Sequence, residues 1–127
     1  MIDSYRSSCP IACTLDLIGD RWTLVVLRDL FLGKQRFEEF LNSPEKISTN
    51  ILADRLRRLE QLGMLDKQPY GNHRRRMQYQ LNERGRSLLP VMEAIMSWGL
   101  DNIPGTEVFP TLRAKRDRSD AKRVVKP

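Results

Sequence analysis

The side chains best suited to binding a partner lie in two short stretches of this sequence, at 48–57 and at 74–76. In the first stretch, hydroxyl, amide and guanidinium groups alternate with leucines at helical spacing, which places the polar groups on one face of a predicted helix. Such groups near the N-terminal end of a helix can reach base edges in the major groove of DNA. The second stretch is three adjacent arginines, which suit contacts with phosphates or the minor groove. With one arginine that starts the preceding predicted helix, the candidate DNA-contacting residues are Arg36, Ser48, Thr49, Asn50, Ala53, Arg57, Arg74, Arg75 and Arg76.

Each of these basic features also has a plainer interpretation. The arginines of the predicted helix at 49–62 could be solvated on an ordinary surface helix, and those at 74–76 could belong to a solvated loop. Arg55 and Arg58 lie nearer the flanks of the helix and could form pairs within the molecule. Arg36 could equally pair with a carboxylate.

Cys9 is a candidate reactive thiol. It lies between Ser8 and Pro10 at the predicted first turn of a helix, where the positive end of the helix dipole favours a thiolate, and nearby Arg6 could add to this. The alternative, which the residues alone favour, is a buried small hydrophobic side chain. Cys13 lies one turn further on, and a disulfide within one regular helix would be strained, so oxidation between subunits is the more plausible route.

Metal and enzyme chemistry have little support in the sequence. His73 is the only histidine, and with two cysteines it falls short of a four-ligand structural zinc site. There is no P-loop, no glycine-rich nucleotide motif and no paired nucleophile and base. We therefore expect no metal, no cofactor and no enzymatic activity.

Apolar spacing, polar caps and glycine stops predict the elements that position these residues. Helices are expected from Ser8, as a cap, to Ile18, from Asp20 to Gly33, and at 36–41 and 49–62. Two runs of β character on either side of Gly71-Asn72, at 64–70 and 77–81, predict a hairpin. Asn82 predicts the start of a last helix that Pro90 kinks.

This order predicts an α+β fold, mostly α: a winged helix-turn-helix with additional N- and C-terminal dimerisation helices. The domain spans 1–112, with the helix-turn-helix at 36–62, the wing at 64–81 and the C-terminal dimerisation helix at 82–101. Because the last helix has more apolar surface than one small monomer needs to bury, we expect a two-fold interface near Ile11, Met92, Ile95, Met96 and Trp98.

Composition and charge agree with a polyanionic partner. The 127 residues carry a formal net charge of +6, and the positive charge is concentrated at 46–86 and in a tail at 113–127 that we expect to be basic and disordered. No apolar run approaches the roughly 18 residues of a membrane span, and no signal peptide is evident. Two cysteines indicate a reduced compartment, so we expect a cytoplasmic protein without a membrane partner.

Spaced motifs occur across residues 9–100, and they include Cys9-Pro10-Ile11, Arg21-Trp22-Thr23, Arg36-Phe37-Glu38-Glu39, Leu56-Arg57-Arg58-Leu59-Glu60, Tyr79-Gln80-Leu81 and Trp98. With these motifs the chain resembles the HxlR-type winged-helix transcriptional regulators of the MarR-like superfamily. The resemblance implies a homodimer that pairs through its terminal helices and binds a pseudo-palindromic operator. It also implies a sensing role for Cys9, because several relatives use an N-terminal cysteine here to detect oxidants or electrophiles.

The expected function is therefore that of a sequence-specific, homodimeric transcriptional regulator that binds a double-stranded DNA operator, with Cys9 as a candidate redox sensor. The inducer, the operator and the regulated gene are not encoded in any recognisable motif. The alternative is a winged-helix protein-interaction module that binds DNA weakly or not at all. Salt dependence separates the two, because DNA binding weakens steeply as salt is added.

Overall fold

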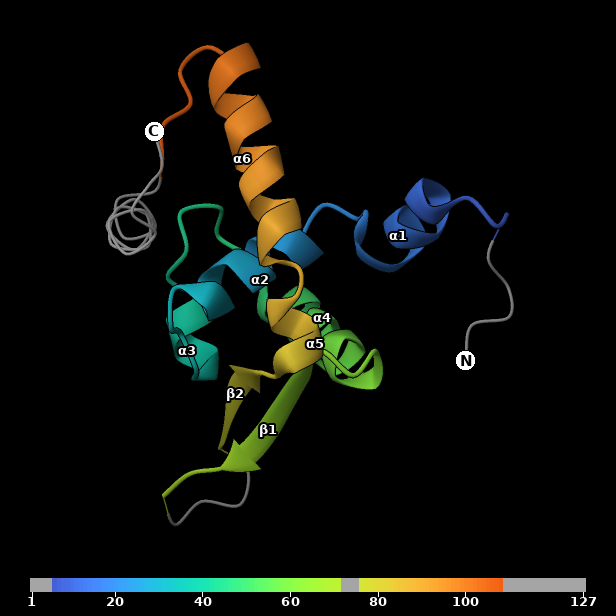
Figure 1. Cartoon of the computed structure of the whole chain (residues 1–127). Helices are drawn as coiled ribbons and strands as arrows, with labels where there is room; N and C mark the ends of the chain where they lie inside the picture. The colour runs from blue at the N-terminus through green and yellow to red at the C-terminus, as the bar shows by residue number, and fades with distance from the viewer. Residues whose placement is uncertain (1–5, 72–75, 109–127) are drawn as a thin grey trace, which may run out of the picture. The chain divides into compact units, whose positions relative to one another are not determined.

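The computed structural model describes residues 6–71 and 76–108. The chain divides into two compact units, Met1–Ser87 and Leu88–Pro127. The predicted tail at 113–127 lies outside the described residues, as do His73, Arg74 and Arg75. The elements follow in the order α1 (Pro10–Ile18), α2 (Thr23–Phe31), α3 (Phe37–Phe40), α4 (Thr49–Gln61), β1 (Leu65–Pro69), β2 (Met77–Leu81), α5 (Glu83–Arg86) and α6 (Leu89–Asn102) (Figure 1).

Helix α1 begins one residue later than its predicted cap requires. Cys9, and not Ser8, is the N-cap residue, and its side chain makes no capping hydrogen bond. Pro10 occupies the first turn, where its fixed φ angle suits a helix and its missing N–H is not needed. The backbone N–H of Cys9 donates instead to Ser7 Oγ at 3.1 Å.

Helix α2 supplies the centre of the first unit. Asp20 stabilises its N-terminus, because Asp20 Oδ2 accepts hydrogen bonds from the backbone N–H groups of Trp22 at 3.0 Å and Thr23 at 3.2 Å. Val26 and Leu27 are buried almost completely. The broad apolar pattern of this segment predicted such central burial, and the structure confirms it.

One charged side chain of α2 is also buried. Asp29 accepts a hydrogen bond from the hydroxyl of Ser43, and it lies 3.2 Å from Arg28 Nη2 and 3.5 Å from Lys34 Nζ. A buried carboxylate is tolerated when it is paired and hydrogen-bonded in this way. These contacts join α2 to the turn that leads from α3 to α4.

Helix α4 packs one leucine stripe against the core. Leu52, Leu56 and Leu59 are buried, and Phe40 from α3 and Ile47 from the preceding turn are buried with them. Each such side chain contributes roughly 1.5–3 kcal/mol to folding when it is fully buried. The predicted helix-turn-helix of 36–62 is therefore anchored by one face of α4, and the opposite face stays exposed.

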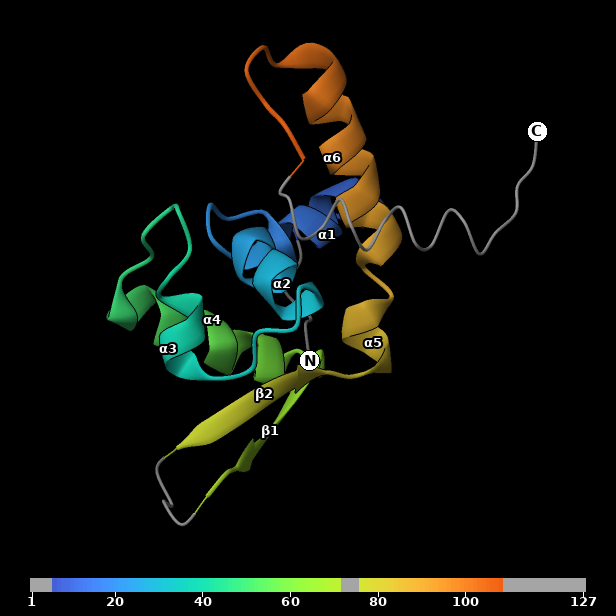
Figure 2. The same cartoon turned by 90° about the vertical axis from the view of Figure 1, so that its left-hand side faces the viewer.

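The predicted hairpin is present as an antiparallel pair of strands. Leu65 faces Leu81 at the base and Pro69 faces Met77 towards the tip. The chain before α3 extends this small sheet, because Arg36 forms a β-bridge with Gln78 and Tyr79 N–H donates to the carbonyl of Gln35 at 2.8 Å. Figure 2 shows the hairpin projecting away from the helices of its unit.

The prediction of one continuous helix at 82–101 is wrong, because the segment forms two helices, α5 and α6. Asn82 caps α5, since its Oδ1 accepts the backbone N–H of Gly85 at 3.0 Å. Pro90 then lies in the first turn of α6 instead of kinking a continuous helix. A proline within a helix clashes with the carbonyl four residues earlier, here that of Arg86, so the chain ends one helix and starts another.

Helix α6 dominates the described part of the second unit. None of its residues is buried, although most of them are apolar. The described residues contain no helix that is both long and apolar enough to traverse a bilayer. With helices and one two-stranded antiparallel sheet in the described chain, the predicted α+β, mostly α class is confirmed.

Candidate nucleic-acid interface

One face of α4 presents the predicted base-reading residues to solvent, from its first turn to Arg57. Thr49, Asn50, Ala53 and Arg57 are all exposed. Ser48 precedes them as the N-cap, and its Oγ accepts the backbone N–H of Ile51 at 3.2 Å. The hydroxyl of Ser48 is thus engaged in capping, while Thr49, Asn50, Ala53 and Arg57 lie on the face of α4 that points away from the core.

Arg57 is the most prominent cation of this surface. Its side chain is 62% exposed, and Arg57 Nη2 lies 2.8 Å from Asp54 Oδ1. The other carboxylate oxygen of Asp54 lies 2.6 Å from Arg55 Nη1. Asp54 therefore contacts two arginines of α4, the exposed Arg57 and the mostly covered Arg55.

Arg55 and Arg58 face the interior of the unit and not the exposed surface. Arg55 Nε lies 2.7 Å from Asp20 Oδ2, and Arg58 Nη2 donates to the carbonyl of Asp16 at 2.7 Å. The prediction that these two arginines pair within the molecule is confirmed. Arg58 ties α4 to α1, and Arg55 ties it to the segment that joins α1 and α2.

Asp20 is held in its ionised form by this network. Its partial burial opposes ionisation, but hydrogen bonds from the Thr23 hydroxyl and from Arg55 outweigh that effect and lower the pKa of Asp20 well below its ordinary value. The same hydrogen bond with Asp20 raises the pKa of Arg55. The capping carboxylate of α2 is therefore also the anchor of α4.

The guanidinium of Arg36 stacks on an aromatic ring, whereas the alternative interpretation was an ion pair with a carboxylate. Its guanidinium carbon lies 4.1 Å from the centroid of the Tyr70 ring, a cation–π contact between α3 and the wing. The backbone N–H groups of Arg36 and Gln35 both donate to Glu39 Oε1, at 2.9 and 2.8 Å, and they lower the pKa of Glu39. Sequence reasoning did not single out Tyr70, because its partner lies far away along the chain.

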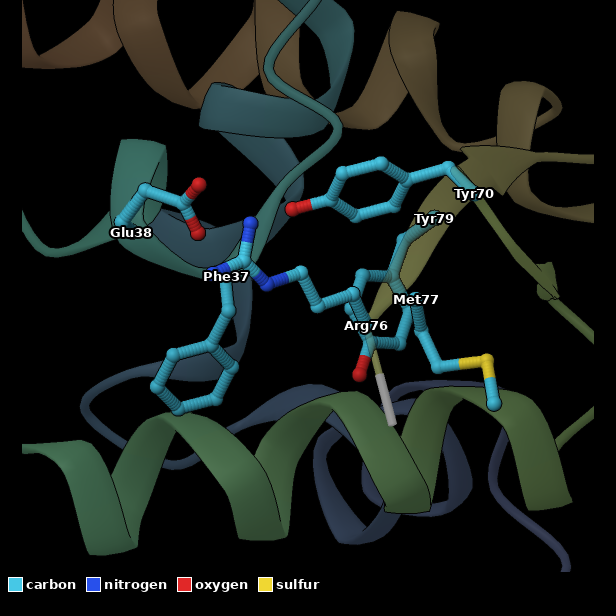
Figure 3. Close-up of a pocket in the computed structure, with 6 residues that line it drawn as sticks. All are labelled: Phe37, Glu38, Tyr70, Arg76, Met77 and Tyr79. Carbon is cyan, nitrogen blue, oxygen red and sulfur yellow. The ribbon is translucent and has the colours of Figure 1, made fainter. Parts of the chain in front are cut away.

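A pocket of about 290 Å³ separates α3 from the wing. Figure 3 shows Arg76 and Tyr70 extending from the wing towards α3, and the lining consists of Phe37, Glu38, Tyr70, Arg76, Met77 and Tyr79. The ring of Tyr79 packs edge-on against Phe40, and burial raises the pKa of its phenol. Arg76 is thereby brought beside the helix-turn-helix, whereas Arg74 and Arg75 lie outside the described residues.

Cys9 is exposed, so the alternative that it is a buried hydrophobic side chain is wrong. Cys13 is half-buried, and its thiol donates to the carbonyl of Ser7 at 3.2 Å. Arg6, which we expected near Cys9, pairs with Asp16 at 2.8 Å. Cys9 therefore meets the access requirement for a reactive thiol.

Metal ligands do not converge in the part of the chain that the structure describes. Within 6–71 and 76–108, no group of three or more histidine, cysteine, aspartate or glutamate side chains could hold an ion. His73 lies outside those ranges.

The predicted interface residues are apolar and accessible within their own units. Ile11 on α1 is 71% exposed, and on α6 Ile95 and Trp98 are 51% and 63% exposed. Met92 and Met96 are half-buried. The structure adds Leu15, which lies one turn after Ile11 on α1 and is also exposed.

A helix-turn-helix whose second helix exposes its polar N-terminal half, followed directly by a two-stranded wing, defines the winged helix-turn-helix class of proteins. The model of the HxlR-like helix-turn-helix family matches residues 17–107. The chain belongs to this family, and the resemblance seen in its motifs is confirmed.

Similar proteins of known sequence are named HTH-type transcriptional regulators. One from Mycobacterium tuberculosis is 39% identical over 93 residues, which cover 73% of this chain and 58% of the relative. The chain thus spans less than two thirds of that relative. YdeP of Bacillus subtilis is 38% identical over 91 residues, which cover 72% of this chain and 71% of YdeP.

Solved structures with the same fold include two that concern redox states. The redox regulator HypR in its reduced form is 32% identical, with a TM-score of 0.69, and the match covers 76% of this chain and 95% of HypR. The reduced form of the transcriptional regulator YodB from B. subtilis is 27% identical, with a TM-score of 0.64, and the match covers 80% of this chain and 100% of YodB. These likenesses confirm the winged-helix fold.

Proposed function

We propose that this protein is a sequence-specific DNA-binding transcriptional regulator that acts as a homodimer on a pseudo-palindromic operator. The observation that carries the proposal is the exposed surface of Thr49, Asn50, Ala53 and Arg57, on a helix whose opposite face is fixed in the core. A helix of this kind fits the major groove, and amide and guanidinium groups can make paired hydrogen bonds with adenine and guanine edges. Such a regulator would act in the cytoplasm, where the operator is.

The wing would supply affinity that does not depend on base sequence. Arg76 directly precedes β2 and its side chain extends towards α3, and Arg74 and Arg75 come before it in the chain. Adjacent guanidinium groups suit phosphates and the narrow minor groove. Arg36 would contribute by fixing the root of the wing through Tyr70, and its exposed position leaves it free to approach a phosphate as well.

The homodimer would form through the apolar surfaces of α1 and α6. Ile11, Met92, Ile95, Met96 and Trp98 are the residues that we assign to it. Ile11, Ile95 and Trp98 are exposed, Met92 and Met96 are half-buried, and an accessible apolar surface is typical of an interface. A two-fold axis would place two copies of α4 about 34–36 Å apart, which is one turn of DNA.

The test starts from the wild-type protein and a pool of random duplexes. Duplexes that the protein retains through repeated selection are sequenced, and affinity for a retained duplex is compared with affinity for a scrambled one over a range of salt concentrations. We expect a palindromic consensus, tighter binding to it, and affinity that falls steeply with salt. Binding of neither duplex would reject the proposal and favour the protein-interaction module.

We also assign to Cys9 a role in redox sensing. Its thiol is exposed, and the similarity to HypR, named a redox regulator, supports the assignment. Diamide can take two electrons and two protons from the Cys9 thiols of two subunits, which leaves one disulfide. A disulfide near the dimer axis would change the spacing of the two α4 helices.

The Cys9 role is tested by titrating operator binding with diamide. The wild type and Cys13→Ser should be released from the selected duplex, whereas Cys9→Ser should stay bound. Equal release of Cys9→Ser and the wild type, or release of neither, would reject the role.

A further inference from the structure

The surface of α4 that we assign to DNA contains one acidic side chain. Asp54 lies four residues after Asn50 and three before Arg57, so the three share one face of the helix. Its side chain is 48% exposed, between the amide and the guanidinium. A carboxylate in this place repels the phosphates of any duplex and therefore lowers affinity for DNA in general.

The carboxylate is held in one orientation by its own helix. Asp54 Oδ2 contacts Arg55 Nη1 at 2.6 Å, while Arg55 Nε contacts Asp20 at 2.7 Å. Asp20 is fixed in turn by the backbone N–H groups at the start of α2. Arg55 therefore holds one oxygen of the Asp54 carboxylate, Oδ2, and the other oxygen, Oδ1, accepts a hydrogen bond from Arg57 Nη2 at 2.8 Å.

Only part of the Arg57 guanidinium is used by this contact. The group carries five N–H donors in a rigid planar fork, and one of its terminal nitrogens, Nη2, faces Asp54. The remaining donors can still reach a pair of acceptors such as those of a guanine edge. A phosphate that draws the whole side chain towards the DNA backbone must instead break the contact with Asp54.

We propose that Asp54 is a positioning residue for DNA specificity: by holding Arg57, it disfavours non-specific phosphate contacts and orients the free donors for a base edge. The proposal rests on the DNA-binding function assigned above. A repulsive group that lowers the affinity for every partner, but lowers it more for the wrong partners, is a general way to obtain specificity.

The experiment compares Asp54→Asn with Glu60→Gln, each of which removes one negative charge from α4. Glu60 is a matched control, because it pairs with Lys67 of β1 at 3.4 Å and not with Arg57. Affinities are measured for a duplex selected by the wild type and for its scrambled counterpart. We expect Asp54→Asn to raise affinity for the scrambled duplex by about two- to fivefold, the factor that one exposed ion pair implies, and to narrow the ratio between the two duplexes. Glu60→Gln should leave the ratio unchanged.

Asp54→Glu separates position from charge. It keeps the net charge but moves the carboxylate by one methylene, so the ratio should narrow as it does in Asp54→Asn. In an Arg57→Ala background, Asp54→Asn should change the ratio no more than Glu60→Gln does, because no guanidinium is left to position.

Two results would overturn the inference while leaving DNA binding in place. The first is that Asp54→Glu keeps the wild-type ratio between the affinities for the selected and the scrambled duplex. The second is that Asp54→Asn, like Glu60→Gln, changes the affinities for both duplexes by the same factor. A wild type without preference for any duplex would instead reject the proposed function, and this inference with it. Thermal unfolding of each variant checks that the substitution leaves the stability of the fold unchanged.

Discussion

At the scale of single residues, the carboxylate of Asp20 links two helices, α2 and α4. It caps α2 and anchors Arg55 of α4, and its pKa is lowered by the hydrogen bonds that outweigh its burial. Sequence analysis predicted the capping role from the position of Asp20 before an apolar run. It did not predict the contact with Arg55, because these residues lie 35 positions apart and meet only when α2 and α4 pack together.

Asp20 should make stability depend on pH. In the unfolded chain its pKa is near the ordinary value of about 4, whereas in the fold it is lower, so between these two pKa values the unfolded state binds the proton and the folded state does not. The free energy of unfolding should therefore be highest above about pH 5 and fall as the solution is acidified towards pH 2. Asp20→Asn should show a weaker fall in denaturant titrations than the wild type does. Asp101→Asn, an exposed aspartate on α6, serves as the control, and identical pH profiles for wild type and Asp20→Asn would contradict the account.

At the scale of elements, periodicity and caps were enough to predict α4 and the wing. The leucine stripe fixed the buried face of α4, Ser48 marked its start, and alternation in 77–81 marked β2. The break between α5 and α6 was missed, because a proline at position 90 suits either a kink or a first turn. In the folded chain, Ser87 and Leu88 form a turn between the two helices, so Pro90 lies in a first turn.

The docking of the wing on α3 should depend on the ring of Tyr70. Tyr70→Ala removes the surface on which Arg36 stacks, and we expect a loss of about 0.5–1 kcal/mol in the free energy of unfolding, together with faster hydrogen exchange at Tyr79 N–H. Tyr70→Phe keeps the ring and should behave as the wild type in both measurements. Unchanged exchange at Tyr79 in Tyr70→Ala would show that the backbone bridge alone holds the wing.

At the scale of the whole molecule, the proposed dimer should be sensitive to charge on the apolar side of α6. Trp98→Glu places a carboxylate where Trp98 is 63% exposed, and it should convert a dimer at micromolar concentration into a monomer in analytical ultracentrifugation. Ser97→Glu adds the same charge on the helix face that carries Glu93 and Asp101, and it should remain dimeric. A wild type that sediments as a monomer at that concentration would contradict the assigned interface.

The most direct test of the central claim compares two sets of alanine substitutions on DNA. Asn50→Ala with Arg57→Ala should narrow the gap between selected and scrambled duplexes, since each good base contact is worth roughly 1–3 kcal/mol. Alanine at Arg74, Arg75 and Arg76 should weaken both duplexes alike and lower the salt slope by up to about 0.9 for each lost phosphate contact. If the wing variant loses specificity while the helix variant keeps it, α4 is not the element that reads DNA.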